Sequence, residues 1–402
     1  MKRISIILLA AMALTAWASC KRNVPAAEDE YIVAAYIWPS CHDDSLAHAY
    51  LWPEGQGEWE VIRKGDPRFE GHYQPKRPLW GYEMDDDPVV VEKWIRTALE
   101  YGVNTFVYDW YWFMDYPYLE GALNDGFLKA PSNEKMHFYI MWANHDVVYN
   151  YWNYHLHGDN TDLLFDPDVD RDQFKVIVDR IITQYFHLPN YLKIDGKPVM
   201  SVFSIDNLAR GLGGYEEAGK AVEYFRSEAR KAGYPDIYFM ETFGGAPMIT
   251  DRFREKQAEK IAKVGIDAVS FYNMGGFDVD YEIHCQNGEA LRDAWDRTFG
   301  IPVYPCVSIG WDDTPRYPEK GIEEVSQQNH TPEVFEQHLR KAKEYADNHP
   351  EQPKIVTVNA WNEWVEGSYL MPDEVFGFGF LEAVRNVFGS SVKAEKNRRQ
   401  DK

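Results

Sequence analysis

Two glutamates near the C-terminal end of the sequence are the residues best suited to chemistry. Glu363 and Glu366 stand three positions apart within residues 359–367 (Asn-Ala-Trp-Asn-Glu-Trp-Val-Glu-Gly), and one helical turn places side chains at this spacing on the same face. Two close carboxylates raise each other's affinity for a proton, so one of them stays protonated near neutral pH. Such a pair can cleave a glycosidic bond, one carboxyl as acid and the other as nucleophile or base. We therefore predict that both glutamates are catalytic; the alternative is a solvated pair on a surface helix.

Aromatic and polar side chains recur where the predicted strands end. Aromatic faces pack against the apolar face of a sugar ring, and carboxylates, amides and imidazoles bind its hydroxyl groups. Core packing is the alternative for the tryptophans, and a buried imidazole bonded to the backbone is the alternative for His72. The predicted sugar-binding residues are Tyr36, Trp38, His42, His72, Asp109, Trp110, Trp112, Asn144, His145, Tyr272, Trp311, Asp312, Asn359, Trp361 and Asn362.

Eight apolar runs rich in Val, Ile, Tyr and Phe alternate with stretches of helical periodicity. Continuous apolar runs are typical of strands buried on both faces. The predicted strands are 31–38, 104–110, 137–142, 198–203, 237–241, 268–272, 303–309 and 354–360. The predicted helices are 88–101, 171–186, 215–231, 252–264, 288–299 and 331–348. This alternation predicts an α/β fold, a (β/α)8 TIM barrel with long βα loops, the longest of them over residues 39–87.

The chemistry of a TIM barrel lies at the carboxyl ends of its strands, which places the predicted site residues at one rim. The alternative is a doubly wound open sheet, which carries a glycine-rich phosphate-binding turn after an early strand. No such turn follows a predicted strand, and residues 211–214 (Gly-Leu-Gly-Gly) do not fit the pattern. We predict one catalytic domain over residues 31–388 and a polar tail over residues 389–402.

The composition excludes several kinds of partner. The 402 residues include 64 acidic and 42 basic side chains, a net charge of −22, whereas nucleic acids and anionic lipid surfaces attract basic faces. The aromatic share of 15% indicates either sugar binding or a large aromatic core. Cys41, Cys285 and Cys306 show no paired spacing, so we expect no metal site and no disulfide framework, although one disulfide is left open.

The N-terminus has the pattern of an export signal. A basic start is followed by an apolar run over residues 4–17 and by Ala18-Ser19-Cys20, and the run is shorter than the ~20 residues of a membrane-spanning helix. Small residues directly before a cysteine resemble the bacterial lipobox. This resemblance implies a signal peptide over residues 1–19, a lipid anchor at Cys20, a tether over residues 20–30 and an outer-membrane lipoprotein facing the periplasm or the cell surface. Secretion with an incidental Cys20 is the alternative.

Residues 359–370 resemble the C-terminal signature of the WbsX-like family, which is related to glycoside hydrolase family 99, the endo-α-mannosidases and endo-α-mannanases. Residues 69–75 (Phe-Glu-Gly-His-Tyr-Gln-Pro) are a second match, and residues 101–113 a third. The matches spread over residues 31–373, nearly all of the chain after the predicted tether. The resemblance implies a (β/α)8 barrel and metal-free, retaining cleavage of an α-linked sugar.

The resemblance also implies a role for each glutamate. By analogy with family 99, Glu363 deprotonates the 2-hydroxyl of the sugar, which displaces the leaving group through an anhydro-sugar intermediate. Glu366 then corresponds to the general acid and, later, the base. The sequence departs from the pattern at Val365, where family 99 hydrolases usually carry His, and at Met371, where WbsX-like chains commonly carry Glu.

We therefore expect an exported retaining hydrolase that cleaves an α-linked, mannan-like polysaccharide or oligosaccharide, with endo action and without a cofactor. Two alternatives stay open: a glycan-binding lipoprotein without turnover, and a WbsX-type glycosyltransferase or transglycosylase of envelope polysaccharide. No sugar nucleotide is expected, because the sequence shows no nucleotide-phosphate site and export separates the protein from the cytoplasmic pool.

Overall fold

The structure is a computed structural model that describes residues 31–244, 250–273, 278–317 and 326–389. The predicted signal peptide, Cys20 and the tether lie outside the described residues, and so does the predicted tail beyond residue 389.

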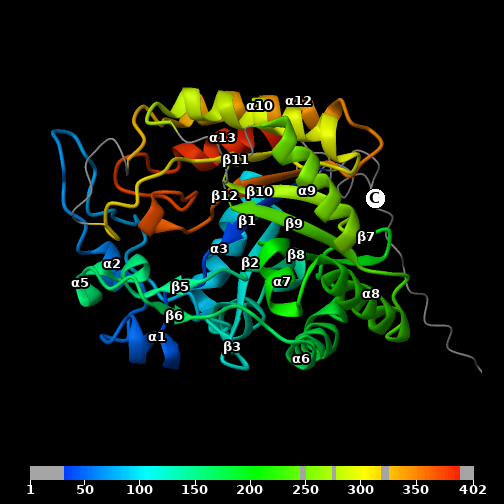
Figure 1. The fold of residues 1–402 in the computed structure, drawn as a ribbon. Coiled ribbons are helices and arrows are strands. Elements are labelled where there is room, and N and C mark those ends of the chain that lie inside the picture. The colour runs from blue at the N-terminus through cyan, green and yellow to red at the C-terminus, as the bar shows by residue number, and fades with distance from the viewer. Residues whose placement is uncertain (1–30, 245–249, 274–277, 318–325, 390–402) are drawn as a thin grey trace, which may run out of the picture. The chain divides into compact units, whose positions relative to one another are not determined.

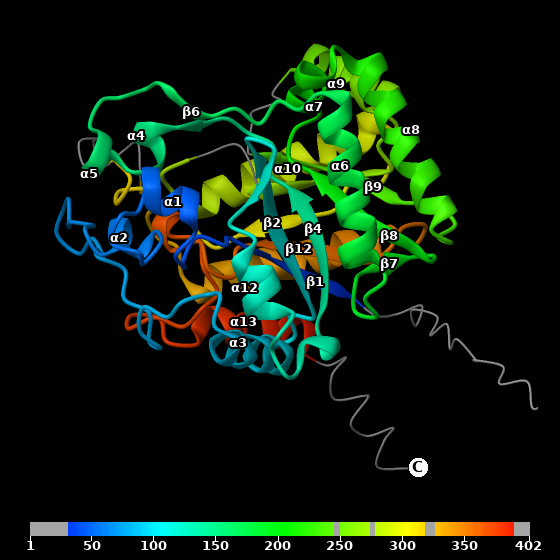
Figure 2. The same cartoon turned by 90° about the horizontal axis from the view of Figure 1, so that it is seen from below.

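Eight parallel strands form a nearly closed barrel (Figures 1 and 2). The hydrogen-bonded order is β10, β9, β8, β4, β2, β1, β12, β11, and a parallel bridge between Val269 and Val303 joins the two ends of this series. In the middle of β1, Ala34 lies opposite Thr105 of β2 on one side and Thr357 of β12 on the other. The strands are β1 Ile32–Ile37, β2 Thr105–Phe113, β4 His137–Trp142, β8 Lys197–Val202, β9 Tyr238–Gly244, β10 Ala268–Asn273, β11 Cys306–Ser308 and β12 Ile355–Asn359. The predicted TIM barrel is confirmed, and the open-sheet alternative is excluded.

Helices that connect the strands cover the outside of the barrel (Figure 2). They are α3 Pro88–Tyr101, α6 Arg171–Ile181, α7 Ile205–Leu212, α8 Tyr215–Lys231, α9 Asp251–Val264, α10 Tyr281–Phe299 and α12 Pro332–Asp347, with α13 Gly379–Phe388 after the last strand. α3 begins where Asp87 accepts a hydrogen bond from the Val89 amide, and it ends at Gly102, whose φ of 95° suits a residue without Cβ. α10 begins seven residues before its predicted start, because Asp280 caps it. α7 and α13 were not predicted, and at eight and ten residues their periodicity is short.

The long loops follow the carboxyl ends of β1 and β4, and in Figure 1 their small elements gather on one side of the barrel. After β1 come α1 Ser45–Tyr50 and α2 Trp59–Ile62; after β4 come β5 Val147–Val148, α4 Tyr149–Trp152, α5 Tyr154–His157 and β6 Leu163–Phe165. The remaining short elements are β3 Tyr116–Tyr118, β7 Lys193–Ile194, π-helical turns at Ala122–Phe127 and Ile182–Phe186, and 3-10 turns at Asn133–Lys135 and Trp364–Glu366.

Part of the aromatic content is core. Trp361 is fully buried, and its ring centroid lies 5.3 Å from that of Phe106 and 6.4 Å from that of Trp94. Cys41, Cys285 and Cys306 are buried and form no disulfide with one another. Within the described ranges, no helix combines the length and the apolar character that a membrane crossing requires.

Candidate active site

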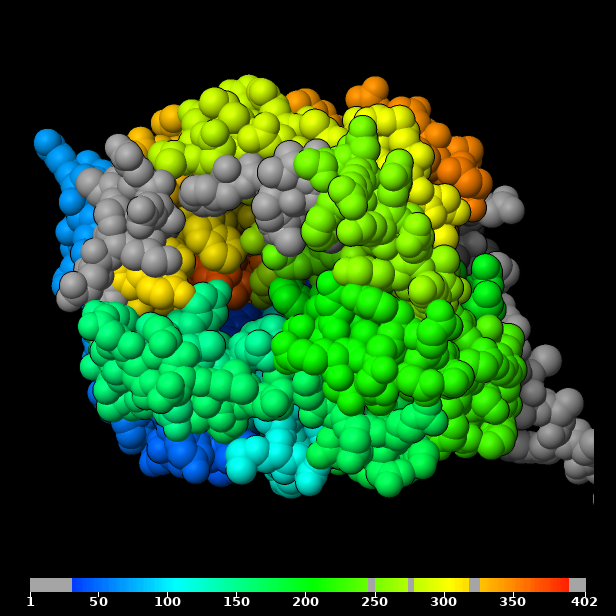
Figure 3. Space-filling view, viewed as in Figure 1, coloured from blue at the N-terminus to red at the C-terminus, as the bar shows by residue number. Residues whose placement is uncertain are grey.

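A cavity of about 510 Å3 lies at the carboxyl ends of the barrel strands. Figure 3 shows its opening, with teal atoms of the segment after β4 along one border and orange atoms of the C-terminal segment in its depth. The lining residues are Trp38, Asp109, Tyr111, Met141, Ala143, His145, Asp146, Val148, Asn150, Tyr151, Trp152, Phe203, Gly244, Tyr272, Asn273, Trp311, Arg316, Tyr317, Glu363 and Glu366.

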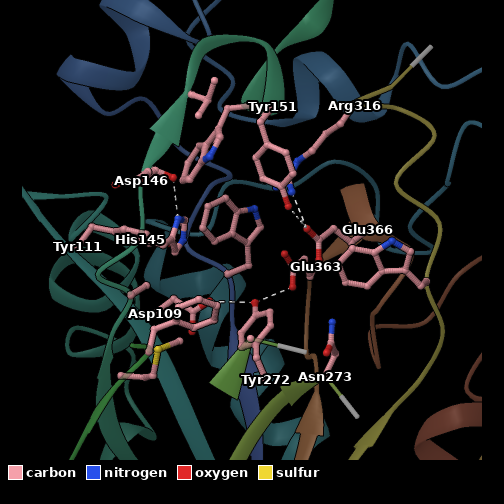
Figure 4. Close-up of a pocket in the computed structure, with 18 of the residues that line it drawn as sticks. Asp109, Tyr111, His145, Asp146, Tyr151, Tyr272, Asn273, Arg316, Glu363 and Glu366 are labelled. Carbon is pink, nitrogen blue, oxygen red and sulfur yellow. Dashed lines mark hydrogen bonds and ion pairs between the residues drawn. The ribbon is translucent and has the colours of Figure 1, made fainter. Parts of the chain in front are cut away.

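Glu363 and Glu366 lie side by side at the bottom of this cavity (Figure 4). Both are buried, at 3% exposure. The chain leaves β12 at Asn359, and the backbones of Glu363 and Ser368 then exchange two hydrogen bonds of 3.1 and 3.0 Å. The turn at Trp364–Glu366 lies inside this small loop and ends at Gly367, whose φ is 67°. A tight loop, rather than a surface helix, therefore points both carboxyls inward.

Glu363 belongs to a chain of three polar groups. The Tyr272 hydroxyl lies 2.6 Å from Glu363 Oε2 and 2.9 Å from Asp109 Oδ2. A phenol has a single hydroxyl hydrogen, so it can donate to only one of these carboxyls. The other contact is a hydrogen bond only if that carboxyl carries a proton. Both contacts are therefore hydrogen bonds when Asp109 or Glu363 holds one carboxylic proton in addition to the hydroxyl hydrogen of Tyr272.

Glu366 is paired with a buried cation. Arg316 Nη1 donates to Glu366 Oε1 at 2.6 Å, and the Tyr151 hydroxyl donates to the same oxygen at 3.2 Å. The other side of the guanidinium binds Glu58, which does not line the cavity. Glu366 is therefore held by charge-assisted hydrogen bonding, whereas Glu363 has a neutral partner.

The carboxyl groups differ from solvated ones in acidity. Burial raises the pKa of Glu363 well above its usual range, and the neighbouring Glu366 adds to the effect. Burial also raises the pKa of Glu366, although the Arg316 charge opposes the rise. Burial likewise raises the pKa of Asp109. The site can therefore hold a carboxylic proton at a pH where free glutamate has lost it, which general acid catalysis requires.

Aromatic rings form the walls of the cavity. The centroid of Trp38 lies 4.9 Å from that of Trp152 and 5.7 Å from that of Tyr111. The ring centroid of His145 lies 5.3 Å from that of Phe203. Burial lowers the pKa of His145, which favours a neutral imidazole that can both donate and accept a hydrogen bond. These walls over a polar floor suit a ligand with apolar ring faces and hydroxyl groups.

The structure brings some of the predicted residues to the cavity and leaves others outside it. Those that line it are Trp38, Asp109, His145, Tyr272, Trp311, Glu363 and Glu366. Those that do not are Tyr36, His42, His72, Trp110, Trp112, Asn144, Asn359, Asp312, Trp361 and Asn362. Each residue of the second group is buried among protein contacts, and we do not carry it into the proposed site.

Three of the outer residues are amides. Asn144 binds both the amide and the carbonyl of Ser204, at 2.9 and 2.8 Å. Asn362 binds the amide and carbonyl of Trp38 at the same two distances. Asn359 accepts from a serine of β11 and lies 3.5 Å from Glu363 Oε2, behind the cavity floor. Asn144 and Asn362 thus join neighbouring loops, and Asn359 joins the ends of β11 and β12. All three amides hold segments that carry lining residues.

His72 and Asp312 meet in a buried polar cluster. Asp312 Oδ2 forms hydrogen bonds with His72 Nε2 at 3.0 Å and Gln74 Nε2 at 2.8 Å, and an ion pair with Lys76 Nζ at 3.0 Å. The cluster fastens the loop after β1 to the loop after β11. Because Trp311 and Arg316 belong to the second loop, the cluster acts on the cavity through the backbone.

Strand alternation explains other outer residues. Successive side chains of a strand point to opposite faces, so Trp110 and Trp112 of β2 point away from the cavity that Asp109 and Tyr111 line. The Trp110 indole donates to Glu120 at 2.8 Å. Trp361 packs in the core as described above.

Two outer residues from β1 and the loop after it have other partners. The Tyr36 hydroxyl donates to the Phe271 carbonyl at 2.8 Å. His42 Nδ1 lies 2.7 Å from Asp85 Oδ1.

Several lining residues were missed in the sequence. Tyr111 follows from the alternation of β2 once Asp109 is placed. Tyr151, Trp152 and Arg316 lie in long loops, where neither spacing nor periodicity marks them. Among the described residues, no group of three or more His, Cys, Asp or Glu is arranged to hold a metal ion.

In a comparison with protein families, residues 33–384 match the family described as glycosyltransferase WbsX. The chain belongs to this family. Two proteins named WxcX and described as uncharacterized, from two strains of Xanthomonas campestris pv. campestris, resemble this WbsX-family chain at 26% and 27% identity. The alignments cover 83% of the chain but only 46% of each relative, so the chain spans about half the length of the curated relatives it matches.

Solved structures share the fold of this WbsX-family member. A family 99 endo-α-mannosidase from Bacteroides thetaiotaomicron, in complex with bis-tris-propane, superposes with a TM-score of 0.60 at 13% identity, covering 91% of this chain and 99% of that one. A second structure of this enzyme gives a TM-score of 0.57 at 14% identity, with 91% and 98% coverage. A glycoside hydrolase-like protein gives 0.56 at 15% identity, with 89% and 94% coverage. The likeness shows that the chain has the fold of these glycoside hydrolases.

Proposed function

We propose that the protein is a retaining glycoside hydrolase that cleaves internal linkages of an α-linked, mannan-like polysaccharide. The observation that carries the proposal is the pair Glu363 and Glu366, both buried and side by side under aromatic walls at the carboxyl ends of the strands. The fold shared with endo-α-mannosidases of family 99 supports the linkage and the sugar.

The proposed chemistry has two steps. In the first, Glu363 takes the proton of the sugar 2-hydroxyl, O2 attacks C1, the glycosidic C1–O bond breaks, and Glu366 protonates the leaving oxygen. In the second, Glu366 takes a proton from water, the water oxygen attacks C1, the C1–O2 bond breaks, and O2 recovers its proton from Glu363. Two inversions at C1 give net retention. The first step needs Glu363 ionised, so the carboxylic proton of the group must rest on Asp109 while the Tyr272 hydroxyl donates to Glu363.

The test uses the purified full chain and a panel of bacterial and fungal α-linked mannans. New reducing ends, product sizes and the anomer first released are followed by reducing-sugar assay, chromatography and proton NMR. We expect oligosaccharides of intermediate length early in the reaction, released as the α-anomer. Glu363→Gln and Glu366→Gln should each lower kcat at least ~10²-fold, while Glu374→Gln, a change at an exposed glutamate, should match wild type.

Two results would contradict the proposal. Wild-type activity in Glu366→Gln would remove the glutamate from the mechanism. Glycan binding without any product would favour the non-catalytic, glycan-binding alternative.

The family description favours a second candidate, transfer of a glycosyl group. The diphosphate of a sugar nucleotide is commonly bound by Arg and Lys side chains. Arg316 is the only Lys or Arg among the described residues that line the cavity, and it already binds two carboxylates. Products longer than the substrate, or transfer to an added acceptor, would favour a transglycosylase instead.

We also propose that the protein is exported as an outer-membrane lipoprotein anchored at Cys20, on the pattern of residues 1–20. In a bacterial host, labelled palmitate should enter the wild-type chain, and Cys20→Ser should abolish the labelling. Secretion of unlabelled wild-type protein would instead favour the reading in which Cys20 is incidental.

A further inference from the structure

An ion pair between Glu58 and Arg316 adjoins the proposed catalytic glutamates. Glu58, from the loop after β1, is fully buried, and the Arg316 side chain, from the loop after β11, is 2% exposed. Arg316 Nε and Nη2 donate to Glu58 Oε1 at 3.1 and 3.0 Å, and Nη1 donates to Glu366 Oε1 at 2.6 Å. One cation is thus shared by a carboxylate inside the cavity and one outside it.

Glu58 is itself fixed by the cavity wall. Its Oε2 accepts hydrogen bonds from the Trp38 indole and, at 3.1 Å, from the Ser40 hydroxyl. The Arg316 guanidinium carbon lies 4.9 Å from the ring centroid of Tyr151 and 5.8 Å from that of Trp38. A planar guanidinium with ion pairs on two sides and rings on its faces has little freedom to move. Glu58 therefore locks a wall residue and the cation with a single carboxylate.

We propose that Glu58 and Arg316 are positioning residues that hold the Glu366 carboxylate in place and divide one positive charge between Glu366 and Glu58. Glu58 and Arg316 therefore have opposite effects on the ionisation of Glu366. Arg316 stabilises the ionised form of Glu366, whereas the negative charge of Glu58 disfavours it. The proposal rests on the proposed function only in that the Glu366 proton is used in catalysis.

Other groups also face Glu366, and both variants of the test leave them unchanged. Apart from Glu58 and Arg316, the titratable groups around it are Glu363, Asp109, Tyr151, Tyr272 and Tyr317. Shifts in opposite directions therefore isolate the charge division from a general loss of packing.

The experiment titrates Glu366 directly and needs no substrate. The full chain is labelled with glutamate carrying 13C at its carboxyl carbon, and the Glu366 resonance is assigned by its absence from Glu366→Gln. We expect its titration midpoint to fall by about one pH unit in Glu58→Gln and to rise by about one unit in Arg316→Gln. Glu120→Gln is the matched control, because Glu120 likewise accepts from a tryptophan indole and pairs with an arginine, Arg180, away from the cavity. It should leave the midpoint unchanged.

Folding is checked by circular dichroism. If Arg316→Gln does not fold, Glu58→Gln and Arg316→Lys provide the test. Lysine keeps the positive charge but lacks the planar guanidinium that donates to both carboxylates. No shift in Glu58→Gln, or a shift upward, overturns the proposal.

Activity supplies a separate readout. The basic limb of the pH–kcat profile should move with the NMR midpoint in each variant, whereas a purely structural role would change kcat or KM and leave the limb in place. If no polysaccharide is cleaved but the midpoints move as expected, the positioning role stands and the proposed function fails.

Discussion

At the scale of single residues, the chemistry of the cavity depends on how its buried carboxyl groups share protons. Asp109, Glu363 and Glu366 are each at most 4% exposed, and Tyr272 joins the first two. Asp109 Oδ1 is buried and has no hydrogen-bond partner among the described residues. A buried oxygen without a partner is costly, so a sugar hydroxyl is a suitable ligand for it.

The Tyr272 hydroxyl provides the first residue-scale prediction. Tyr272→Phe removes one group that contacts two carboxyls, and a hydrogen bond to a charged group contributes about 1.5–3 kcal/mol. We expect kcat/KM to fall on the order of 10–100-fold. The pH dependence of kcat/KM should also change. Steady-state kinetics across pH measure it.

Tyr281→Phe is the matched control for this change. It removes a buried hydroxyl that donates to the Ser308 carbonyl at 2.6 Å and does not line the cavity. It should lower stability while kcat/KM stays near wild type. An equal loss of kcat/KM in both variants would remove the special role of Tyr272.

At the scale of elements, a buried glutamate joins β9 to two helices. Glu241, 2% exposed, accepts a hydrogen bond of 3.1 Å from the Ile205 amide at the start of α7 and lies 3.3 Å from the Gln257 amide nitrogen of α9. Burial raises the pKa of Glu241 to about 8. The first helical turn of α7 thereby gains an acceptor, and the neutral form of the carboxyl is favoured in the folded protein.

This pKa predicts how stability changes with pH. Glu241 holds its proton in the folded state up to about pH 8, whereas an unfolded glutamate loses it near pH ~4.3. Its contribution is therefore fully present below the unfolded pKa and is lost as pH rises through the folded pKa. Glu241→Gln cannot ionise, so its stability relative to wild type should grow between pH ~5 and ~8 and then level, by on the order of a few kcal/mol.

Urea unfolding of both proteins at a series of pH values measures this difference, in which all other titrating groups cancel. A difference that is constant with pH would show that Glu241 keeps its ordinary acidity in the folded protein.

At the scale of the whole molecule, the charge is strongly negative, at −22. A field of this sign repels anionic polymers and neither steers nor repels neutral ones, and salt screens it over a Debye length of ~10 Å at 0.1 M. The proposed mannan-like substrate is neutral.

The salt dependence of KM follows from this charge. For a neutral mannan, KM should change by less than about twofold between roughly 20 and 500 mM NaCl. For an acidic polysaccharide, KM should fall as salt rises. Initial-rate measurements on both polymers test the expectation, and a neutral mannan whose KM falls steeply with salt would contradict it.

Many structural features of this protein are determined by residues that are neighbours in the sequence. The barrel strands are continuous apolar runs that are hydrophobic enough to be buried on both faces, and helices such as α3 carry a cap, an N-terminal proline and a terminal glycine within a few residues of their ends. The pair Glu363 and Glu366 lies in one short segment, so their proximity also follows from the sequence. For these features the interacting groups are neighbours along the chain.

The tertiary structure alone decided what surrounds that pair. Arg316 contacts Glu366 across 50 residues and Glu58 across 258, and Tyr272 contacts Asp109 across 163. Loops bring these partners together, and loop paths depend on long-range packing rather than on periodicity. The sequence by itself therefore determined the barrel and the glutamate pair. Barrel closure decided which aromatic and polar residues face the cavity, because it sets which side of each strand points inward.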